Sequence, residues 1–282
     1  MGQRDPRTHE HLAPAVQGAR AASHEADATR LHAVGRVYLW HGGSLWIGRG
    51  HGRSNWHDHH AIQVTLALEG VCHFRTRTDA AWAEFKGAIV QAHRHHEFET
   101  HGATVAQLFI EPETIEGRQL VGRFVDDITA LPETERLAMS QLLAAALQAR
   151  PAQPENMIAA ARAATLLLAG VAAPDASSDT RIDKAIAHIR SHIHGPIKLA
   201  EMAAAAHLSA GRFRHLFVAE TGTSFRVYVL WMRLNVAIQV VMAGESWTAA
   251  AHAAGFADSA HLTRTFKRMF GMNPGGLVPG SQ

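Results

Sequence analysis

Residues 255–274 read GFADSAHLTRTFKRMFGMNP, and this stretch decides the fold of the C-terminal part of the chain. Gly-Phe opens it, Gly-Met-Asn-Pro closes it, and the apolar residues between them have helical spacing. The segment also carries three positive charges, on Arg264, Lys267 and Arg268. The pattern predicts a compact basic helix bounded by two glycine turns, which raises the question of what this helix binds.

The same plan occurs once earlier in the chain. KLAEMAAAAHLSAGRFRHLFVAETG and WTAAAHAAGFADSAHLTRTFKRMFG both run from a short Ala-rich helix through a tight turn to a second helix, which ends at Gly222 or Gly271. Ser209 and Asp258, 49 residues apart, stand where they would cap the second helices. Small alanines let the two helices of each copy cross closely, as in a helix-turn-helix. The sequence therefore predicts two such units, spaced by a long apolar helix around 225–242.

Residues off the apolar stripe of each second helix are polar or small and are expected to face outward. Arginine pairs with guanine through two hydrogen bonds or with phosphate, and helix N-termini attract phosphates. A helical bundle with ordinary charged faces would explain one such unit, but two basic units in tandem favour DNA binding. The predicted DNA-binding residues are Ser209, Gly211, Arg212, Arg214 and His215 in the first unit, and Ser259, Ala260, His261, Thr263, Arg264, Lys267 and Arg268 in the second.

The charge of the chain is unevenly distributed. The net charge is +2, yet the residues from Arg181 onward hold 11 Lys/Arg against 5 Asp/Glu. This basic third favours an anionic partner for that part of the chain.

Cys72 is the single cysteine, which excludes an intramolecular disulfide framework and fits a reducing cytoplasm. The first twenty residues lack the apolar core of a secretory signal, so we expect a cytoplasmic protein with no membrane partner.

The N-terminal part shows a different periodicity. Residues 36–110 contain short alternating segments such as IQVTLALEGVCHFRT, residues 62–76, in which Glu69-Gly70 predicts a turn. After Pro112 apolar residues recur three and four apart, in IEGRQLVGRFVDDI (115–128) and in two later segments between 132 and 171. These patterns predict an α+β protein: an N-terminal β-barrel or sandwich, helices that follow it, and an all-α tandem helix-turn-helix domain.

Histidines cluster in the predicted strand region. His57 and His59 lie two apart on a predicted strand in HDHHAIQVTLALEG, and Gln63 is a further even step away, so all three are expected on one face. GAIVQAHRHHEF offers a third histidine from another strand, at His93, His95 or His96. Such a set can hold zinc, iron, manganese or nickel. Three interpretations stay open: histidines with no ligand, an effector pocket without metal, and a metal site.

Residues 181–278 resemble the DNA-binding domain of AraC-type (AraC/XylS) transcription regulators. The similarity runs through DKAIAHIRSHIHGPIKLAEMA, a first unit that ends in ETGTSF, and AAGFADSAHLTRTFKRMFGMNP. It implies asymmetric promoter binding by two helix-turn-helices, with base-facing residues at Gly211, Arg212, Arg214 and His215, then Ser259, Ala260, His261 and Arg264. Gly211 contributes no side chain, so the first helix is expected to read fewer bases. The tail GGLVPG lacks the aromatic and basic residues usual after the position of Pro274.

The histidine region resembles the cupin motifs. His57, His59, Gln63 and Gly70 match the first motif, and Gly87 and His96 match a compact second one. The resemblance implies a cupin-like sensor barrel in which an effector, or a divalent metal on three imidazoles, is bound by His57, His59, Gln63 and His96. Gln63 replaces the usual glutamate and so removes an anionic ligand. The AraC-type resemblance also implies dimerisation through part of the helices at 115–149 and 155–173.

Together these observations predict a domain order and a function. The parts are a loose arm (1–30), a cupin-like barrel sensor (31–112), a helical segment that could dimerise (113–171), a linker (172–180) and a double helix-turn-helix domain (181–282). The predicted function is sequence-specific transcription regulation by a homodimer that binds double-stranded DNA and a small-molecule effector. Activation and repression both stay open, and an activator would also contact RNA polymerase. One alternative is a metal-dependent cupin enzyme that oxidises a small molecule, which metal content and turnover would reveal. The other is an architectural DNA-binding protein without a preferred site.

Overall fold

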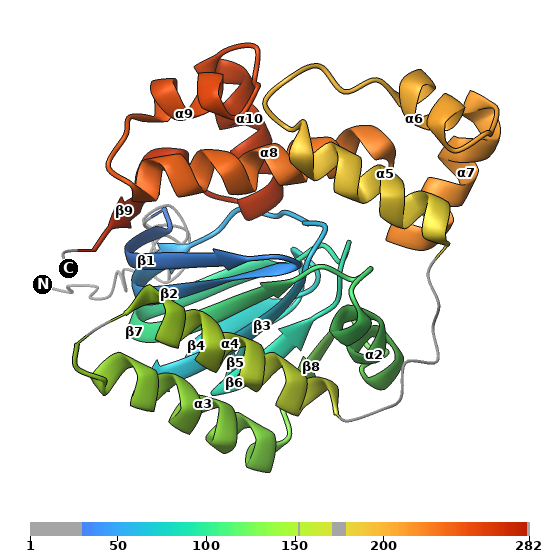
Figure 1. Cartoon of the computed structure of the whole chain (residues 1–282). Coiled ribbons are helices and arrows are strands. Elements are labelled where there is room, and N and C mark those ends of the chain that lie inside the picture. The colour runs from blue at the N-terminus through green and yellow to red at the C-terminus, as the bar shows by residue number, and fades with distance from the viewer. Residues whose placement is uncertain (1–29, 152, 171–178, 281–282) are drawn as a thin grey trace, which may run out of the picture.

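The computed structural model describes residues 30–151, 153–170 and 179–280 (Figure 1). The predicted arm and almost all of the predicted linker therefore lie outside the described residues. The strands are β1 (His32–Trp40), β2 (Gly43–Arg53), β3 (Ile62–Glu69), β4 (Cys72–Arg75), β5 (Ala83–Phe85), β6 (Gly87–Val90), β7 (Glu97–Ile110), β8 (Ile128–Ala130) and β9 (Leu277–Pro279). The helices are α2 (Ile115–Arg123), α3 (Glu133–Gln148), α4 (Pro154–Ala169), α5 (Thr180–Ser191), α6 (Leu199–Ala205), α7 (Ala210–Thr221), α8 (Phe225–Met242), α9 (Trp247–Ala253) and α10 (Ser259–Phe270).

The strands form one curved sheet in the order β8-β6-β3-β7-β2-β1-β9, to which β4 and β5 are attached through β7. All pairs are antiparallel except β1 with β9. One edge of the long β7 pairs with β2, and the other pairs with β3 over 104–110 and with β4 over 97–100. The sheet therefore bends around β7, close to Gly102, which has a φ of 87°.

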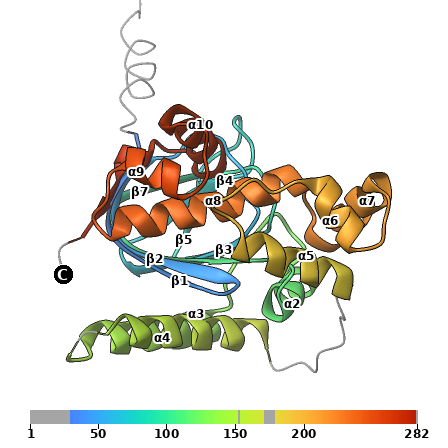
Figure 2. The ribbon, with the colours of Figure 1, turned by 45° about the horizontal axis from the view of Figure 1, so that its top comes forward.

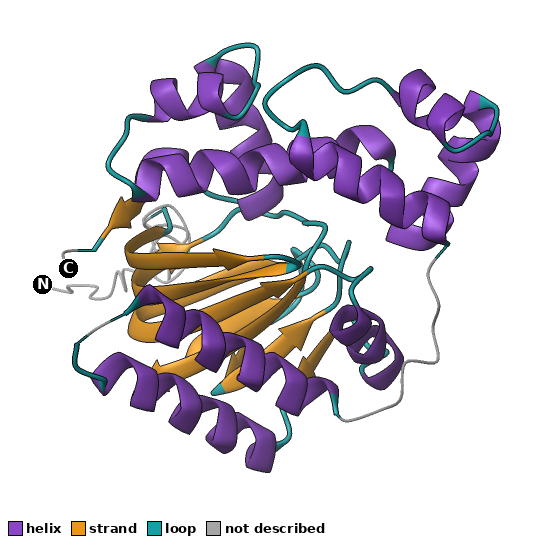
Figure 3. Cartoon of the chain, viewed as in Figure 1, coloured by secondary structure: helices purple, strands orange, loops and turns teal. Residues whose placement is uncertain are grey.

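Alternation along the strands gives the sheet two apolar faces, and both are covered. Leu45 and Ile47 of β2 pack with α2, α3 and α4, whereas Trp46 between them packs with α8, α9 and α10. Figures 2 and 3 show the resulting layers, with α3 and α4 on one side of the strands and α8 on the other. The helical domain is thus seated on the sheet and is not a separate body on a tether.

The C-terminal helices form the two predicted units around α8. The first unit is α6 and α7, packed with α5 and the first part of α8, and the second is α9 and α10, packed with the rest of α8. α8 is the one described helix that is long and apolar enough to cross a membrane, but half of its residues are buried in the protein. Helices at the core of a folded domain have the same composition, and α8 contributes to the cores of both units.

Three local predictions were wrong. The helix predicted over 115–128 ends at Arg123, because the Gln91 amide donates to the carbonyls of Leu120 and Phe124 and so caps it, after which β8 joins the sheet beside β6. His57 and His59 do not lie on a regular strand; residue 57 only bridges to residue 96. Strands also occur beyond the predicted barrel range of 31–112, at β8 and at β9.

Candidate functional sites: a basic helical face and a buried imidazole cluster

The second helices of both units are capped as expected. The Ser209 hydroxyl accepts from the backbone N–H of Arg212, and the Asp258 carboxylate accepts from that of His261 at 2.6 Å. Each helix ends at a glycine in the left-handed region, Gly222 with a φ of 71° and Gly271 with a φ of 63°. These caps fix where α7 and α10 begin and end, and thus which residues face outward.

The structure leaves every predicted DNA-binding residue accessible. Ser259, His261 and Thr263 are half-buried, and the others are exposed: Ser209, Gly211, Arg212, Arg214, His215, Ala260, Arg264, Lys267 and Arg268. Arg212, Arg214, Arg264, Lys267 and Arg268 make no side-chain hydrogen bond or ion pair with any residue of the described ranges. Elsewhere in the chain, arginines such as Arg75, Arg123 and Arg136 are paired with glutamates. Five cations without counter-ions are therefore collected on α7 and α10.

The sequence did not single out Arg226, which the structure adds to this face. Arg226 lies in the first turn of α8, is exposed, and has no partner among the described residues. With His261, Arg264 and Arg268 of α10 it lines a surface hollow of about 550 Å³. The signal available in the sequence was only one of two arginines in an apolar helix, and such a residue is ordinarily solvated.

His57, His59 and His96 are brought together as predicted, although not by a regular strand. The backbones of His57 and His96 exchange two hydrogen bonds, of 3.1 and 2.9 Å. The ring centroids lie 4.3 Å apart for His57 and His96, 5.2 Å for His59 and His96, and 5.8 Å for His57 and His59. His93 and His95 are not part of this cluster, since His93 faces His60 and His95 stacks on Trp56.

Each of the three rings is oriented by a backbone carbonyl. Nδ1 lies 2.8 Å from the carbonyl oxygen of Asn55 for His57, of Ala61 for His59 and of Arg94 for His96. A carbonyl only accepts, so Nδ1 carries the proton and the Nε2 lone pair of each neutral ring points elsewhere. His96 Nε2 is buried and has no partner among the described residues.

Gln63 belongs to the same cluster. Its side-chain amide lies 2.9 Å from His59 Nε2 and 3.0 Å from the Thr65 hydroxyl. In the structure the Gln63 Oε1 faces His59 Nε2 and the Gln63 NH₂ group donates to the Thr65 hydroxyl. A proton on His59 Nδ1 makes Nε2 an acceptor, which requires the Gln63 amide to be turned by 180° so that its NH₂ group faces Nε2. Burial lowers the pKa of His57 to about 3, lowers that of His59 and holds that of His96 well below its ordinary value, so the rings are neutral at neutral pH.

The second unit closes the space beside these imidazoles. Phe270, the last residue of α10, packs on Trp46 at 4.9 Å and on Phe109 at 5.8 Å between ring centroids. Together with Met272 it leaves a cavity of about 50 Å³, lined also by His57, Gln63 and Phe98. This volume holds a few small solvent molecules or an ion, but not an organic molecule of ordinary effector size.

The end of α10 also contacts the loop between β2 and β3, residues 54–61, which carries His57 and His59 and is called the histidine loop here. The Asn55 N–H donates to the Gly271 carbonyl at 2.6 Å. A Cβ on Gly271 would stand 2.3 Å from the Asn55 oxygen and 2.6 Å from His57 Nδ1, so only glycine fits this contact. The imidazole cluster is therefore in van der Waals contact with the C-terminus of α10, the second helix of the second unit.

A polar network joins the sheet to the first unit. Arg190 of α5 forms an ion pair with Glu111 and a contact with His41, and Glu113 accepts from His60 at 2.9 Å. The Tyr228 hydroxyl lies beside Glu113 and Arg190. Burial and the neighbouring Glu113 carboxylate raise the pKa of Glu111 to about 7, against the lowering effect of Arg190. This attachment of the helical domain is polar and titratable.

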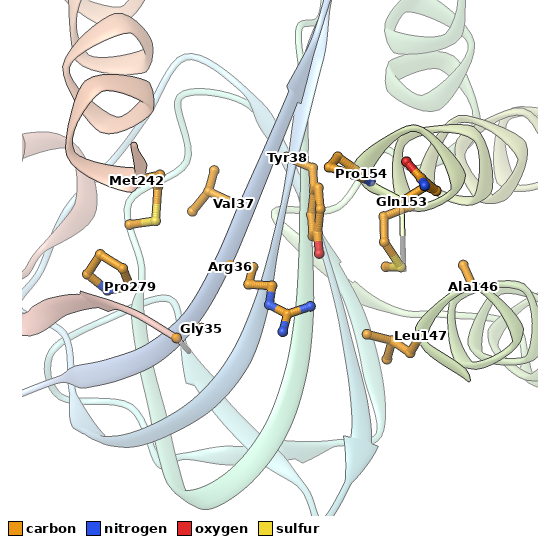
Figure 4. Close-up of a pocket in the computed structure, with 12 residues that line it drawn as sticks. Gly35, Arg36, Val37, Tyr38, Ala146, Leu147, Gln153, Pro154, Met242 and Pro279 are labelled. Atoms are coloured by element: carbon orange, nitrogen blue, oxygen red, sulfur yellow. The ribbon is translucent and has the colours of Figure 1, made fainter. Parts of the chain in front are cut away.

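A larger pocket of about 400 Å³ lies outside the curved sheet (Figure 4). It surrounds β1, with Arg36 and Tyr38 directed towards α3 and α4, and Val37 on the side of Met242. Gln153, Met157 and Pro279 complete its walls, so the sheet, the α3–α4 pair and the C-terminal domain all contribute. Its size lies within the range of small-molecule sites.

Comparison with known proteins agrees with the architecture of the helical domain. Residues 202–278 match a family model described as a helix-turn-helix domain. The chain is 30% identical over 88 residues to the probable transcriptional regulator LumQ of Photobacterium leiognathi, a match that covers 31% of this chain and 36% of LumQ. It is 31% identical over 99 residues to the uncharacterized HTH-type transcriptional regulator YidL of Escherichia coli, covering 35% of this chain and 33% of YidL. The chain thus spans about a third of the length of the curated relatives it matches.

Among solved structures, the whole described fold is similar to ToxT of Vibrio cholerae. The TM-score is 0.52 at 12% sequence identity, over 87% of this chain and 94% of ToxT. Identity this low shows a shared fold alone, and that fold is a sheet-rich N-terminal region followed by a helical C-terminal domain. The chain therefore joins a sheet-rich N-terminal region to a C-terminal helix-turn-helix domain.

Proposed function

We propose that the protein is a sequence-specific DNA-binding transcription regulator. The observation that carries this proposal is the set of unpaired cations on α7 and α10, because five basic side chains without carboxylate partners lie on the two helices that a tandem helix-turn-helix inserts into DNA. Arg212, Arg214 and Arg264 are the candidates for contacts to base edges. Lys267 and Arg268, near the end of α10, are candidates for phosphate contacts.

Selection of random duplex DNA by the purified full-length protein tests this function. Regulation at defined promoters requires enrichment of a motif with two blocks about one helical turn apart. Binding without enrichment, together with a steep salt dependence, would instead identify an architectural DNA-binding protein. A duplex pool that is not retained at moderate salt, with or without added divalent metal, would contradict DNA binding altogether.

We further propose that the N-terminal domain is a cupin-like sensor whose ligand controls the placement of α10. Support comes from the contact between the histidine loop and Gly271, and from Phe270, which lines the cavity beside His57 and Gln63. A ligand changes the DNA-binding domain only by binding its two arrangements with different affinity. Any ligand that enters the cavity meets Phe270 and therefore discriminates between a docked and a displaced α10.

Size favours a metal ion as the ligand of the imidazole cluster. One ring nitrogen from each of the three histidines lies within 4.8 Å of the other two, each Nδ1 is anchored to a carbonyl, and His96 Nε2 is unsatisfied. This is the orientation that outer-sphere hydrogen bonds give to metal-binding imidazoles. Zinc, iron, manganese or nickel would be held by His57, His59 and His96, and Gln63 would release His59 Nε2. The ion would supply a cross-link between the segments that carry these residues.

Metal analysis of the full-length protein, before and after loading, tests this site. Wild type should bind about one ion per chain, and His96→Ala should lose it, while His95→Ala, an exposed neighbour, should keep it. Retention of the ion by His96→Ala would contradict the proposed ligand set. Turnover of a small molecule by the loaded protein would revive the oxidising enzyme, which we do not propose because the relatives are regulators by name.

An organic effector remains the second candidate ligand of the sensor. One ToxT structure, similar at a TM-score of 0.50 and 11% identity, is described as bound to (E)-4-(8-methylnaphthalen-1-yl)but-3-enoic acid. In this chain the cavity beside Gln63 would have to expand for such a molecule, whereas the pocket around β1 has the volume already. Loss of organic-acid binding in Arg36→Ala, with the same binding unchanged in His96→Ala, would assign an acid effector to the pocket around β1.

We also propose that the protein acts as a cytoplasmic homodimer and, as an activator, contacts RNA polymerase. Exposed leucines on α3 and α4 support a dimer seam there: Leu137, Leu166 and Leu167 are 46%, 52% and 36% exposed. Apolar side chains grouped on helical faces are typical of protein interfaces. The mass of the protein in solution, compared between wild type and Leu166→Glu, tests the seam.

A further inference from the structure

The hollow between α8 and α10 has the composition of an anion site. Its walls are Arg226 in the first turn of α8 and His261, Arg264 and Arg268 along α10, and its floor is formed by Val227, Leu230 and Thr265. The volume is about 550 Å³ and the hollow opens to solvent. Three guanidinium groups therefore converge on one concave surface from two helices, and Arg226 lies 38 residues before Arg264 in the chain.

Nothing in the described part of the chain neutralises these guanidinium groups. Arg226, Arg264 and Arg268 have no ion pair or side-chain hydrogen bond there. Other cations of the same domain do form ion pairs: Arg181 pairs with Asp179 at 2.6 Å, and Lys198 pairs with Glu201 at 3.0 Å. Like charges brought together repel one another, so this surface favours an anion placed between them.

We propose that this hollow binds a backbone phosphate of the DNA duplex, with Arg226 as a phosphate ligand supplied by the spacer helix. The proposal rests on the proposed DNA-binding function and adds to it a contact that lies outside both recognition helices. Arg226 follows the first unit by a few residues, and its partners belong to the second. The phosphate would therefore be held at the junction of the two units.

The donor set favours phosphate over a base edge. Each guanidinium offers five N–H donors, and the non-bridging oxygens of a phosphate accept several of them at once from different directions. A base edge presents at most two acceptors in one plane to one arginine. Arg226 is exposed, while the next turn of its helix is buried in the core at Tyr228, Val229 and Leu230, so its backbone is held in place. An exposed guanidinium on a fixed backbone outside the recognition helices suits a contact to the sugar-phosphate backbone.

Salt dependence of binding is the measurement that separates a phosphate contact from the alternatives. Affinities of full-length wild type, Arg226→Gln, Arg226→Lys and Lys184→Gln would be measured over a series of KCl concentrations. The probes are the duplex recovered by selection and an unrelated duplex of equal length. Lys184 is the matched control, because it is an exposed cation of the same domain, on α5, without an ion pair and outside the hollow.

Loss of one phosphate contact lowers the slope of log K against log salt by about 0.9. Arg226→Gln is expected to show this loss and to weaken both duplexes by the same factor, so that the preference for the selected site is unchanged. Arg226→Lys keeps the charge and should retain the slope. Lys184→Gln should match wild type, and all variants should unfold at the wild-type temperature.

Two outcomes would overturn the inference while leaving the proposed function intact. An unchanged slope for Arg226→Gln would show that no phosphate sits in the hollow. Weakening of the selected duplex alone would make Arg226 a reader of bases. Failure of wild type to bind either duplex would overturn the proposed function itself, and this inference with it.

Discussion

The two helix-turn-helix units follow one plan but are held in different ways. The first, α6 and α7, packs on α5 in a core that contains Ile182, Ile189, Phe213 and Phe217 and takes no residue from the sheet. The core of the second, α9 and α10, includes Trp46 and Phe109 of the sheet. One motif is therefore supported within its own domain, and the other is completed by the N-terminal domain.

The contacts at the ends of the recognition helices repeat this difference. Gly271 at the end of α10 receives a backbone hydrogen bond from Asn55 and touches His57. Gly222 at the end of α7 is approached only by the ring of His93, 3.2 Å from where its Cβ would stand. The sheet holds the first unit mainly through the polar Arg190–Glu111 pair. A change inside the sheet therefore has a direct route to the second unit and an indirect one to the first.

Truncating the core phenylalanines should give the largest effect and separate the two modes of support. Phe217→Ala and Phe266→Ala each remove a fully buried ring and should each lower the free energy of unfolding by ~3–5 kcal/mol. Phe266 shares its core with Trp46, so Phe266→Ala should also change tryptophan fluorescence and expose the sheet to hydrogen exchange. Phe217→Ala should leave the β2 amides protected.

The control for this pair is Leu108→Ala, which opens the opposite face of the sheet. It should lower the stability of the N-terminal domain, and the amides of α10 should not become open to hydrogen exchange before those of α7. Equal loss of β2 protection in Phe217→Ala and Phe266→Ala would contradict the distinction between the units.

Arginine substitutions on the two recognition helices test whether the units read DNA separately. Arg212→Ala should weaken binding by ~1–3 kcal/mol and relax preference only in the block read by the first unit, and Arg264→Ala should do so only in the other block. The measurement is the binding of duplexes mutated in one block at a time. An arginine whose loss weakens all duplexes equally would be a phosphate contact and not a base reader.

The sequence predicted each unit well, because its signals are local. Ser209 and Asp258, the turn before each second helix and the closing glycines all act within a few residues of the structure that they determine. The same holds for His57, His59 and His96, whose grouping followed from a motif even though the predicted strand was wrong.

What the sequence did not predict depends on contacts between distant segments. β9 pairs with β1 across more than 240 residues. Phe270 lines the cavity beside His57 and Gln63. The sequence could not predict this position of Phe270, because an apolar stripe on α10 is equally expected for a helix that is buried only in its own unit. Arg226 was missed for the same reason, since its significance comes from Arg264 and Arg268 on another helix. Arg190 and Glu111 likewise carried no pattern that would pair them.

The polar attachment of the first unit should respond to pH, unlike the apolar attachment of the second. The pKa of Glu111 is raised to about 7 in the folded protein, mainly by burial, from an ordinary value near 4.5. Between these values the folded chain keeps a proton that the unfolded chain has released, so the free energy of unfolding falls as pH rises through this window. The decline should be ~2–3 kcal/mol, given ~1.4 kcal/mol per unit of pKa over the roughly 2.5 units between these values.

Urea unfolding of wild type and Glu111→Gln at pH 5 and pH 7.5 measures this contribution. Glutamine stays neutral and can still accept from Arg190, so the variant should lose most of the decline between the two pH values. Glu135→Gln, on an exposed ion pair with Arg123, is the matched control and should follow wild type. An identical decline in wild type and Glu111→Gln would show that Glu111 is already ionised at pH 5.

The smallest predicted effect concerns the position where the two recognition helices differ most simply. Gly211 and Ala260 are each the second residue of their helix, and both are exposed. A Cβ on Gly211 would meet no atom within 4 Å, so Gly211→Ala should raise the free energy of unfolding by ~0.5–1 kcal/mol through the lower backbone entropy of the unfolded chain. Ala260→Gly should lower it by a similar amount. Gly211→Ala could be stabilised as expected and still lose affinity for the first block of the DNA site alone. That result would mean that the backbone of α7 approaches DNA more closely than the backbone of α10 does. Glycine at position 211 would then be needed for α7 to dock on DNA, and would not simply be a position without a side-chain contact.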